Sequence, residues 1–168
     1  MNVIFDASAL LNLSNGSALD LALLVPDIVA RIGPMVQAEC KTIASVLDVF
    51  ILDGRITVLN DEMLPASLFL SLLERYQLGE GETECLAFAC QGDDIVCCDD
   101  RRARAMITRE LGEGRVTGTL GILITMIHHG LIESQSAIAA YEQMRRQGGF
   151  LPEVSVQDLD KAAEFMRD

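Results

Sequence analysis

The stretch from Gly79 to Asp100, GEGETECLAFACQGDDIVCCDD, restricts the possible folds of this chain more than any other. Its middle is apolar enough for a buried helix at 82–91 followed by a buried strand at 94–98. Carboxylates at the ends of a buried segment are costly unless a partner compensates their charge. The stretch has no basic residue and seven acidic ones: Glu80, Glu82, Glu84, Asp93, Asp94, Asp99 and Asp100. It therefore indicates a site as well as a core.

Short apolar strands alternate with helices along the whole chain. The alternation predicts an α/β fold, a three-layer sandwich in which helices cover both faces of a short central parallel sheet, as in Rossmann-like folds. The strands are expected at 2–5, 27–32, 55–59, 94–98 and 115–117. The helices are expected at 9–13 with Ser8 as N-cap, and at 17–24, 34–52, 65–76, 82–91, 101–111, 120–129, 133–146 and 155–166.

Composition indicates the number of domains, the location of the protein and the state of its cysteines. With 168 residues, half of them hydrophobic, the chain is long enough for one well-packed domain. No apolar run reaches the ~18 residues of a membrane span, and the start MNVIFDAS has no basic region typical of a signal peptide. The five cysteines are odd in number and lie in apolar surroundings, which indicates reduced thiols and a cytoplasmic protein. A zinc site is not expected because no CxxC occurs.

The formal net charge of −12 disfavours a broad nucleic-acid-binding surface. Any such binding must be local, assisted by a metal, or completed by another chain. Five of the thirteen basic residues do fall within fifteen positions just after the acidic stretch, between Arg101 and Arg115. In this cluster Arg101, Arg102 and Arg104 are the candidate phosphate contacts, and salt bridges to the nearby acids are the alternative.

Topology should bring several of the acids together. In a parallel α/β fold the helix N-termini lie at the same edge as the strand C-termini, where such folds place their sites. Unpaired carboxylates repel one another unless a cation compensates them, and hard oxygen ligands suit Mg²⁺ or Mn²⁺. Such ions activate water and bind phosphoryl oxygens, so phosphodiester hydrolysis is the expected chemistry. The positions that meet the criterion are Asp6, Glu39, Glu84 and the pair Asp99–Asp100.

Each candidate also has a simpler explanation. Asp6 can cap the following turn, and Glu39 can be a solvated helix residue. Of Asp99 and Asp100, one is expected to bind metal and the other to cap helix 101–111. Helix capping explains Ser8 and Thr119, the helix dipole explains Glu80 and Glu82, and a solvated loop is expected for Asp93 and Asp94.

Three motifs in order resemble the PIN-domain nucleases, which include the VapC-type toxins. They are similar to an uncharacterised PIN-like branch with a G-E-x-E helix, a D-D-x-x-A-R turn and a G-T-x-G-x-L helix start. Here they read GETEC from Gly81, DDRRAR from Asp99 and GTLGIL from Gly118. The resemblance covers roughly residues 1–132 and implies a PIN-like domain there, with residues 133–168 as C-terminal helices packed on the same domain.

The resemblance implies a role for each acid. Asp6 matches the first acid of the family, Glu39 the second, Glu84 the third, which is usually Asp, and Asp100 or Asp99 the fourth, with the register favouring Asp100. Asp6, Glu84 and Asp100 would hold Mg²⁺ or Mn²⁺, and Glu39 would bind the ion or position water.

The sequence therefore predicts a metal-dependent endoribonuclease that acts on single-stranded or structured RNA. One form of this function is the toxin of a toxin–antitoxin pair, with a small antitoxin as partner. Apolar helices near the N-terminus also suggest a homodimer. The alternative is a nucleic-acid-binding or protein-interaction module that keeps the PIN fold with weak or no catalysis.

Overall fold

The computed structural model describes residues 1–166 and contains one sheet of five parallel strands. The spatial order is β3-β2-β1-β4-β5, so β1 lies at the centre. The predicted strands are all confirmed, most of them one or two residues shorter than expected. Their bounds are Asn2–Phe5 for β1, Val29–Ile32 for β2, Ile56–Val58 for β3, Ile95–Cys97 for β4 and Val116–Thr117 for β5.

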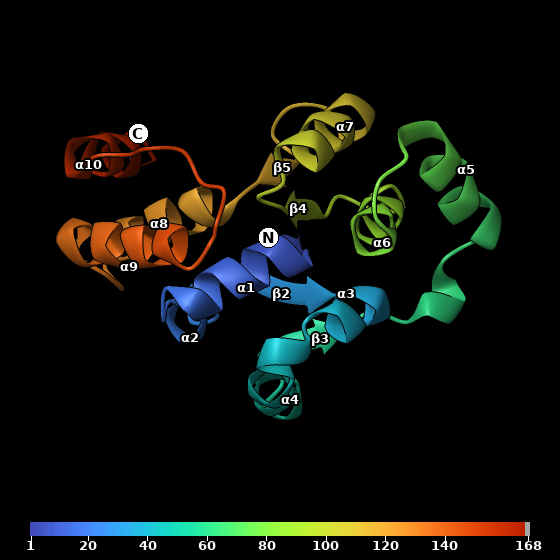
Figure 1. Ribbon diagram of the computed structural model, residues 1–168, viewed down its shortest axis with the longest axis horizontal. Coiled ribbons are helices and arrows are strands. Elements are labelled where there is room, and N and C mark those ends of the chain that lie inside the picture. The colour runs from blue at the N-terminus through green and yellow to red at the C-terminus, as the bar shows by residue number, and fades with distance from the viewer. Residues whose placement is uncertain (167–168) are drawn as a thin grey trace.

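Helices cover both faces of this sheet. Figure 1 shows α1, α2, α8, α9 and α10 gathered on one side and α5 and α6 on the other, which confirms the three-layer α/β sandwich. Within residues 1–166 none of the helices has the length and apolar character needed to cross a bilayer. The helices are α1 Ala7–Asn15, α2 Leu19–Ala22, α3 Pro34–Glu39, α4 Ala44–Leu52, α5 Ala66–Tyr76, α6 Glu80–Ala89, α7 Arg101–Leu111, α8 Thr119–His128, α9 Ser134–Arg146 and α10 Val156–Phe165, with 3-10 turns at Lys41–Ile43 and Asp61–Met63.

The central strand and the helices that pack on it form the core. Val3, Ile4 and Phe5 of β1 are fully buried, as expected for a strand with helices on both faces. The two C-terminal helices join the same body, because α9 contacts α1 and α8 while α10 contacts α8 and α9. Tyr141 of α9 is buried, and its hydroxyl donates to the carbonyl of Pro152 in the connection to α10 at 3.0 Å.

The single helix predicted at 34–52 is wrong. The chain leaves helical geometry at Cys40, whose φ of −78° and ψ of 42° end α3, and a 3-10 turn separates α3 from α4. The apolar residues of 34–52 do not form one buried stripe either, since Val46 is 41% exposed. The β-branched pair Thr42–Ile43 at the break favours helix only weakly. Glu39 consequently ends a short helix instead of lying inside a long one.

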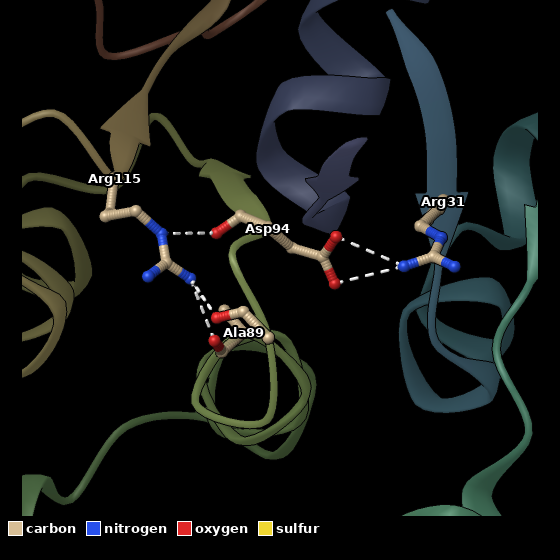
Figure 2. A network of polar contacts seen from close by, with 5 residues as sticks. Arg31, Ala89, Asp94 and Arg115 are labelled. Carbon is tan, nitrogen blue, oxygen red and sulfur yellow. Dashed lines mark hydrogen bonds and ion pairs between the residues drawn. The ribbon is translucent and has the colours of Figure 1, made fainter. Parts of the chain in front are cut away.

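A polar network ties β2 to the segment before β4, at the edge opposite the strand C-termini. Figure 2 shows Asp94 accepting two hydrogen bonds from Arg31 Nη1, both 3.1 Å. Arg115 donates to the carbonyls of Asp94, Ala89 and Gly92 at 2.8–2.9 Å. Asp93 is exposed, as predicted for a solvated loop, but for Asp94 that prediction is wrong because the Arg31 guanidinium compensates its burial.

Replacing Asp94 with Asn should therefore destabilise the protein. The change removes the negative partner of Arg31, and because the Arg31 side chain is 30% exposed we expect a loss of about 1–2 kcal/mol in the free energy of unfolding. Urea denaturation measures the loss. Asp93→Asn is the matched control and should stay within about 0.5 kcal/mol of wild type. Equal effects of the two substitutions would contradict the role assigned to this ion pair.

Candidate functional site

Two of the predicted acids leave neighbouring strands at the carboxyl edge of the sheet. β1 pairs with β4 so that Phe5 lies opposite Cys97, and the Asp6 amide donates to the Cys97 carbonyl at 3.0 Å. Asp6 follows β1 directly, and Asp99 follows β4 by two residues. The site is therefore built where parallel sheets present the residues after their strands.

Asp6 is buried at the start of α1, where it is only 2% exposed. Its Oδ1 accepts the Ala9 amide at 2.8 Å, and both carboxylate oxygens accept the Ser8 hydroxyl at 2.9 Å. The predicted N-cap Ser8 is wrong, since α1 begins at Ala7 and Asp6 is its N-cap. An aspartate at the end of a strand can reach the amide three residues ahead, so it caps the helix before the serine can.

Burial controls the charge of Asp6. Desolvation raises its pKa from 3.8 to about 6, although hydrogen bonds from the Cys98 thiol, the Ala9 amide and the Ser8 hydroxyl act in the opposite direction. The negative charge of Asp99 raises the pKa further. All three donors are uncharged, and none of the ion pairs formed by residues 1–166 includes Asp6. The carboxylate is thus buried without a cation.

Ser8 links Asp6 to Asp99. Its hydroxyl donates to Asp6 and accepts the Asp99 amide at 3.0 Å. The Asp99 carboxylate in turn accepts the Asn12 side-chain amide at 2.8 Å, the Thr119 amide at 2.8 Å and the Thr119 hydroxyl. The sequence indicated only capping roles for Ser8 and Thr119 and did not single out Asn12. The spacing of Ser8 and Asn12, four residues apart on one helix face, was the signal available.

Asp100 and the arginines that follow it in α7 differ in their contacts. Asp100 is exposed, and its Oδ1 accepts the Ala103 amide at 2.7 Å, which makes it the N-cap of α7. Arg104 donates to the Cys98 carbonyl at 2.9 Å, while Arg102 donates to the Tyr76 carbonyl at the end of α5 at 3.2 Å. Arg101 is exposed. The structure thus gives the capping role to Asp100 and links Asp99 to Asp6 through Ser8.

Glu39 and Glu84 form a reciprocal contact between α3 and α6. Glu84 is fully buried and accepts the Met35 amide of α3, at 3.1–3.2 Å, and the Val36 amide at 3.3 Å. Glu39, at the end of α3 and exposed, accepts the Gly81 amide of α6 at 3.2 Å. Burial raises the pKa of Glu84, and these amides counteract the shift.

Two glycines permit this close approach. A Cβ at Gly33 would overlap the Glu84 carboxylate, and a Cβ at Gly81 would lie 2.7 Å from Glu39 Oε1. Neither position can therefore carry a side chain without moving one of the two glutamates. The short helix α3 and the helix α6 are held together by carboxylates at each other's first turn.

Four of the five predicted acids consequently form two groups. Asp99 acts on the pKa of Asp6, whereas Asp61 and Glu39 act on that of Glu84. Among residues 1–166 no three His, Cys, Asp or Glu side chains converge as a ready-made metal site. Each of the five acids instead accepts a backbone amide in the first turn of a different helix: α1, α3, α6, α7 and α8.

A family model described as a PIN domain matches residues 2–164. The chain belongs to the PIN-domain family. The match spans all five strands and α9 and extends into α10, beyond the part in which the motifs lie. PIN domains are generally nucleases, with nucleic acid as substrate and divalent metals as their usual cofactors, and this chain has a fold of that nuclease type. No curated protein and no solved structure matches the chain.

The donor chemistry at the sheet edge of this PIN domain fits a hard divalent ion. Asp6 and Asp99 supply carboxylate oxygens from adjacent strands, and Mg²⁺ is commonly held by one or two protein carboxylates, with waters and substrate phosphates completing its coordination. The buried charge of Asp6, which has no basic partner in the described chain, is the feature that a cation would compensate. Glu84 fits less well because it is fully buried, whereas Asp99 is partly exposed, and because α3 amides occupy the Glu84 carboxylate.

The raised pKa of Asp6 predicts an unusual pH dependence of stability in the metal-free protein. Between about pH 4 and pH 6 the folded chain holds a proton on Asp6 that the unfolded chain has lost, so the free energy of unfolding falls as the pH rises. A pKa shift of this size lowers the free energy of unfolding by roughly 3 kcal/mol once the pH is above 6. The Asp6→Asn side chain cannot ionise, so the free energy of unfolding of this variant should fall less than that of wild type over the same pH range.

Urea unfolding in EDTA at a series of pH values between about 4 and 7.5 tests this expectation. Asp93→Asn, an exposed acid far from the site edge, is the control and should follow the wild-type curve. A curve for Asp6→Asn that runs parallel to wild type would show that burial does not perturb the Asp6 carboxyl.

Proposed function

We propose that this PIN-domain protein is a Mg²⁺- or Mn²⁺-dependent endoribonuclease that hydrolyses phosphodiester bonds in RNA. One observation carries the proposal: Asp6, 2% exposed, is a carboxylate with only uncharged donors, and it lies beside a second carboxylate, Asp99. A buried acid pair of this kind is costly unless a cation joins it. A PIN fold that presents such a pair at the carboxyl edge of its sheet supports metal-assisted nuclease chemistry.

Asp6 and Asp99 are the residues that we assign to the ion. When bound, Mg²⁺ or Mn²⁺ would activate water and offset the charge that develops on the phosphoryl group. Ser8 fixes the two acids relative to each other, since its hydroxyl contacts both residues. Asn12 and Thr119 hold the Asp99 carboxylate in one orientation.

The other three predicted acids take different parts in the proposal. Asp100 lies next to Asp99 and is exposed, so it can reach the ion through a water while it caps α7. Glu39 is exposed at the same edge, where it would orient water. Glu84 is a positioning residue in this scheme, because its carboxylate holds the start of α3 and thereby places Glu39.

Of the predicted phosphate contacts, we propose Arg101 and Arg104. Both line the hollow that adjoins Asp99, and bidentate guanidinium groups suit phosphate. Arg102 is directed at the carbonyl end of α5 and has a structural contact there. Local basic residues of this kind would offset the net charge of −12 at the place where RNA binds.

A binding module with weak or no catalysis is the second candidate. It is favoured by one observation, that every predicted acid already accepts a helix amide and that Glu84 is fully enclosed. Calorimetry with Mn²⁺ separates the two functions. If the protein is the nuclease, wild type should release or absorb heat on binding Mn²⁺ and Asp6→Asn should not. If it is a binding module, wild type need not bind Mn²⁺.

The nuclease should cut labelled single-stranded RNA in the presence of Mn²⁺ and leave it intact in EDTA. Asp6→Asn and Asp99→Asn should each lower the rate by at least about 100-fold, because each removes a charged ligand at the reacting phosphate. Asp93→Asn, which is exposed and outside the site, should cut like wild type. Circular dichroism confirms that the variants are folded. Cleavage that persists in folded Asp6→Asn protein would refute the assignment.

The same variants test the toxin form of this function. If the protein is the toxin of a toxin–antitoxin pair, expression of the wild-type chain should arrest growth and expression of Asp6→Asn should not. Co-expression of a small protein encoded beside it should then restore growth. Normal growth with an active wild-type enzyme would leave the nuclease in place and remove the toxin role.

We also propose a homodimer. The exposed side of α4 carries Val46, Val49 and Leu52 at intervals of three residues, and Leu52 is 86% exposed. A stripe of this kind can be covered by a second copy. Light scattering should give twice the chain mass of 18.3 kDa for wild type and the single mass for Leu52→Lys. A monomeric wild-type protein would exclude the dimer.

A further inference from the structure

A large hollow lies between the start of α7 and the end of α9. Its volume is about 1070 Å³, above the roughly 300–1,000 Å³ of typical small-molecule sites. Arg101 and Arg104 line it from α7, while Arg145 and Arg146 line it from the last turn of α9. Only two acids, Asp99 and Glu142, share the lining. In a chain with a net charge of −12, this hollow concentrates positive charge.

The arginines of α9 are held only by weak surface pairs. Arg145 lies 3.3 Å from Glu153, which is 88% exposed, and Arg146 lies 3.4 Å from Glu142 on the same helix. Exposed ion pairs contribute little to stability and are screened by salt. A phosphate group can therefore replace either glutamate at small cost, and guanidinium groups bind phosphate through two parallel hydrogen bonds.

Phe150 stands at the rim of the same hollow. It lies in the connection between α9 and α10, and its side chain is 99% exposed. An aromatic ring held beside basic side chains is the combination that proteins use for single strands, because the ring stacks on a base while the cations contact the backbone. A base inside a duplex is already stacked on its neighbours and cannot make this contact.

The hollow reaches Asp99 of the acidic pair. A second, smaller hollow shares Asp99, Gly149 and Phe150 with the first and is also lined by Ser8 and Asn12, which hold the two acids. A strand that passes Asp99 would thus meet Phe150 and the four arginines next. Residues 99–104 and 145–150 are far apart in the sequence and come together through the packing of α9 on α1 and α8.

We propose that the hollow binds the single-stranded segment next to the scissile phosphate, with one unpaired base stacked on Phe150 and backbone phosphates on Arg101, Arg104, Arg145 and Arg146. This inference rests on the proposed nuclease function for the direction of the strand towards Asp99. The binding itself requires no metal and no cleavage. It can therefore be measured apart from catalysis.

Fluorescence anisotropy of a labelled single-stranded RNA of about ten nucleotides in EDTA tests the proposal. Wild-type protein should bind it, and Phe150→Ala should weaken binding by about 5- to 100-fold, the range found for loss of a stacked base. Phe150→Trp should bind at least as well as wild type. The same RNA annealed to its complement should bind more weakly than the single strand.

The chain offers matched controls for both kinds of contact. Phe165→Ala removes an aromatic ring on α10 that is 85% exposed and does not line the hollow, and it should bind like wild type. Arg101→Gln and Arg145→Gln should each reduce the slope of log affinity against log salt by about 0.7. Arg109→Gln, an exposed arginine of α7 outside the hollow, should leave that slope unchanged.

A 2-aminopurine base in the RNA reports stacking directly. Its fluorescence should be quenched on binding to wild type and to Phe150→Trp, but not to Phe150→Ala held at saturating concentration. Equal affinity of Phe150→Ala and wild type would overturn the proposal, as would equal binding of single and double strands. A hollow that takes a protein segment instead would leave the RNA unbound by wild type, and that result would overturn the proposal too. Loss of cleavage with these binding results intact would instead refute the nuclease function alone.

Discussion

The free amides at the starts of helices are the constraint on which this structure depends. Five carboxylates, from Asp6 to Asp100 along the chain, each accept an amide in the first turn of a different helix. A parallel sheet with crossover helices brings those helix starts to the edge where its strands end. Because each start carries a partial positive charge, the edge tolerates an assembly of acids that would repel one another elsewhere. The acids build the fold as well as the candidate site.

The amides do not compensate all five acids equally. Glu84 has amides of α3 for both oxygens, and Asp99 has two donors from Thr119 and one from Asn12. Asp6 has donors too, yet its pKa remains raised to about 6 because burial outweighs them. The deficit of positive charge is therefore local to Asp6, which the negative charge of Asp99 disfavours further. In a PIN domain, that deficit is where a divalent ion has the most to contribute.

The net charge of this protein does not describe every part of its surface. The chain carries −12, but much of that charge lies at helix starts, in loops and on the outer helices, while four arginines face one hollow beside Asp99. The field that a substrate meets depends on the groups within about 8–10 Å, the screening distance at physiological salt. An acidic protein can accordingly present a basic path to a polyanion. The acidic remainder would disfavour contact anywhere else on its surface.

The sequence by itself determined the element types and the edge to which the acids belong. The short apolar runs, such as those ended by Asp6 and Asp99, are signals contained in windows of a few residues, and together they predicted all five strands and the α/β class. Only the tertiary structure decided that Ser8 links Asp99 to Asp6 while Asp100 caps α7, that Glu84 reaches α3, and that Phe150 and Arg101 line one hollow. These outcomes depend on side-chain directions and on helices that are distant in the sequence, 87 residues apart in the contact of Asn12 with Asp99 and 128 in that of Asn15 with Gln143. Local propensity carries no information about such distances, because the contacts exist only after the layers have packed.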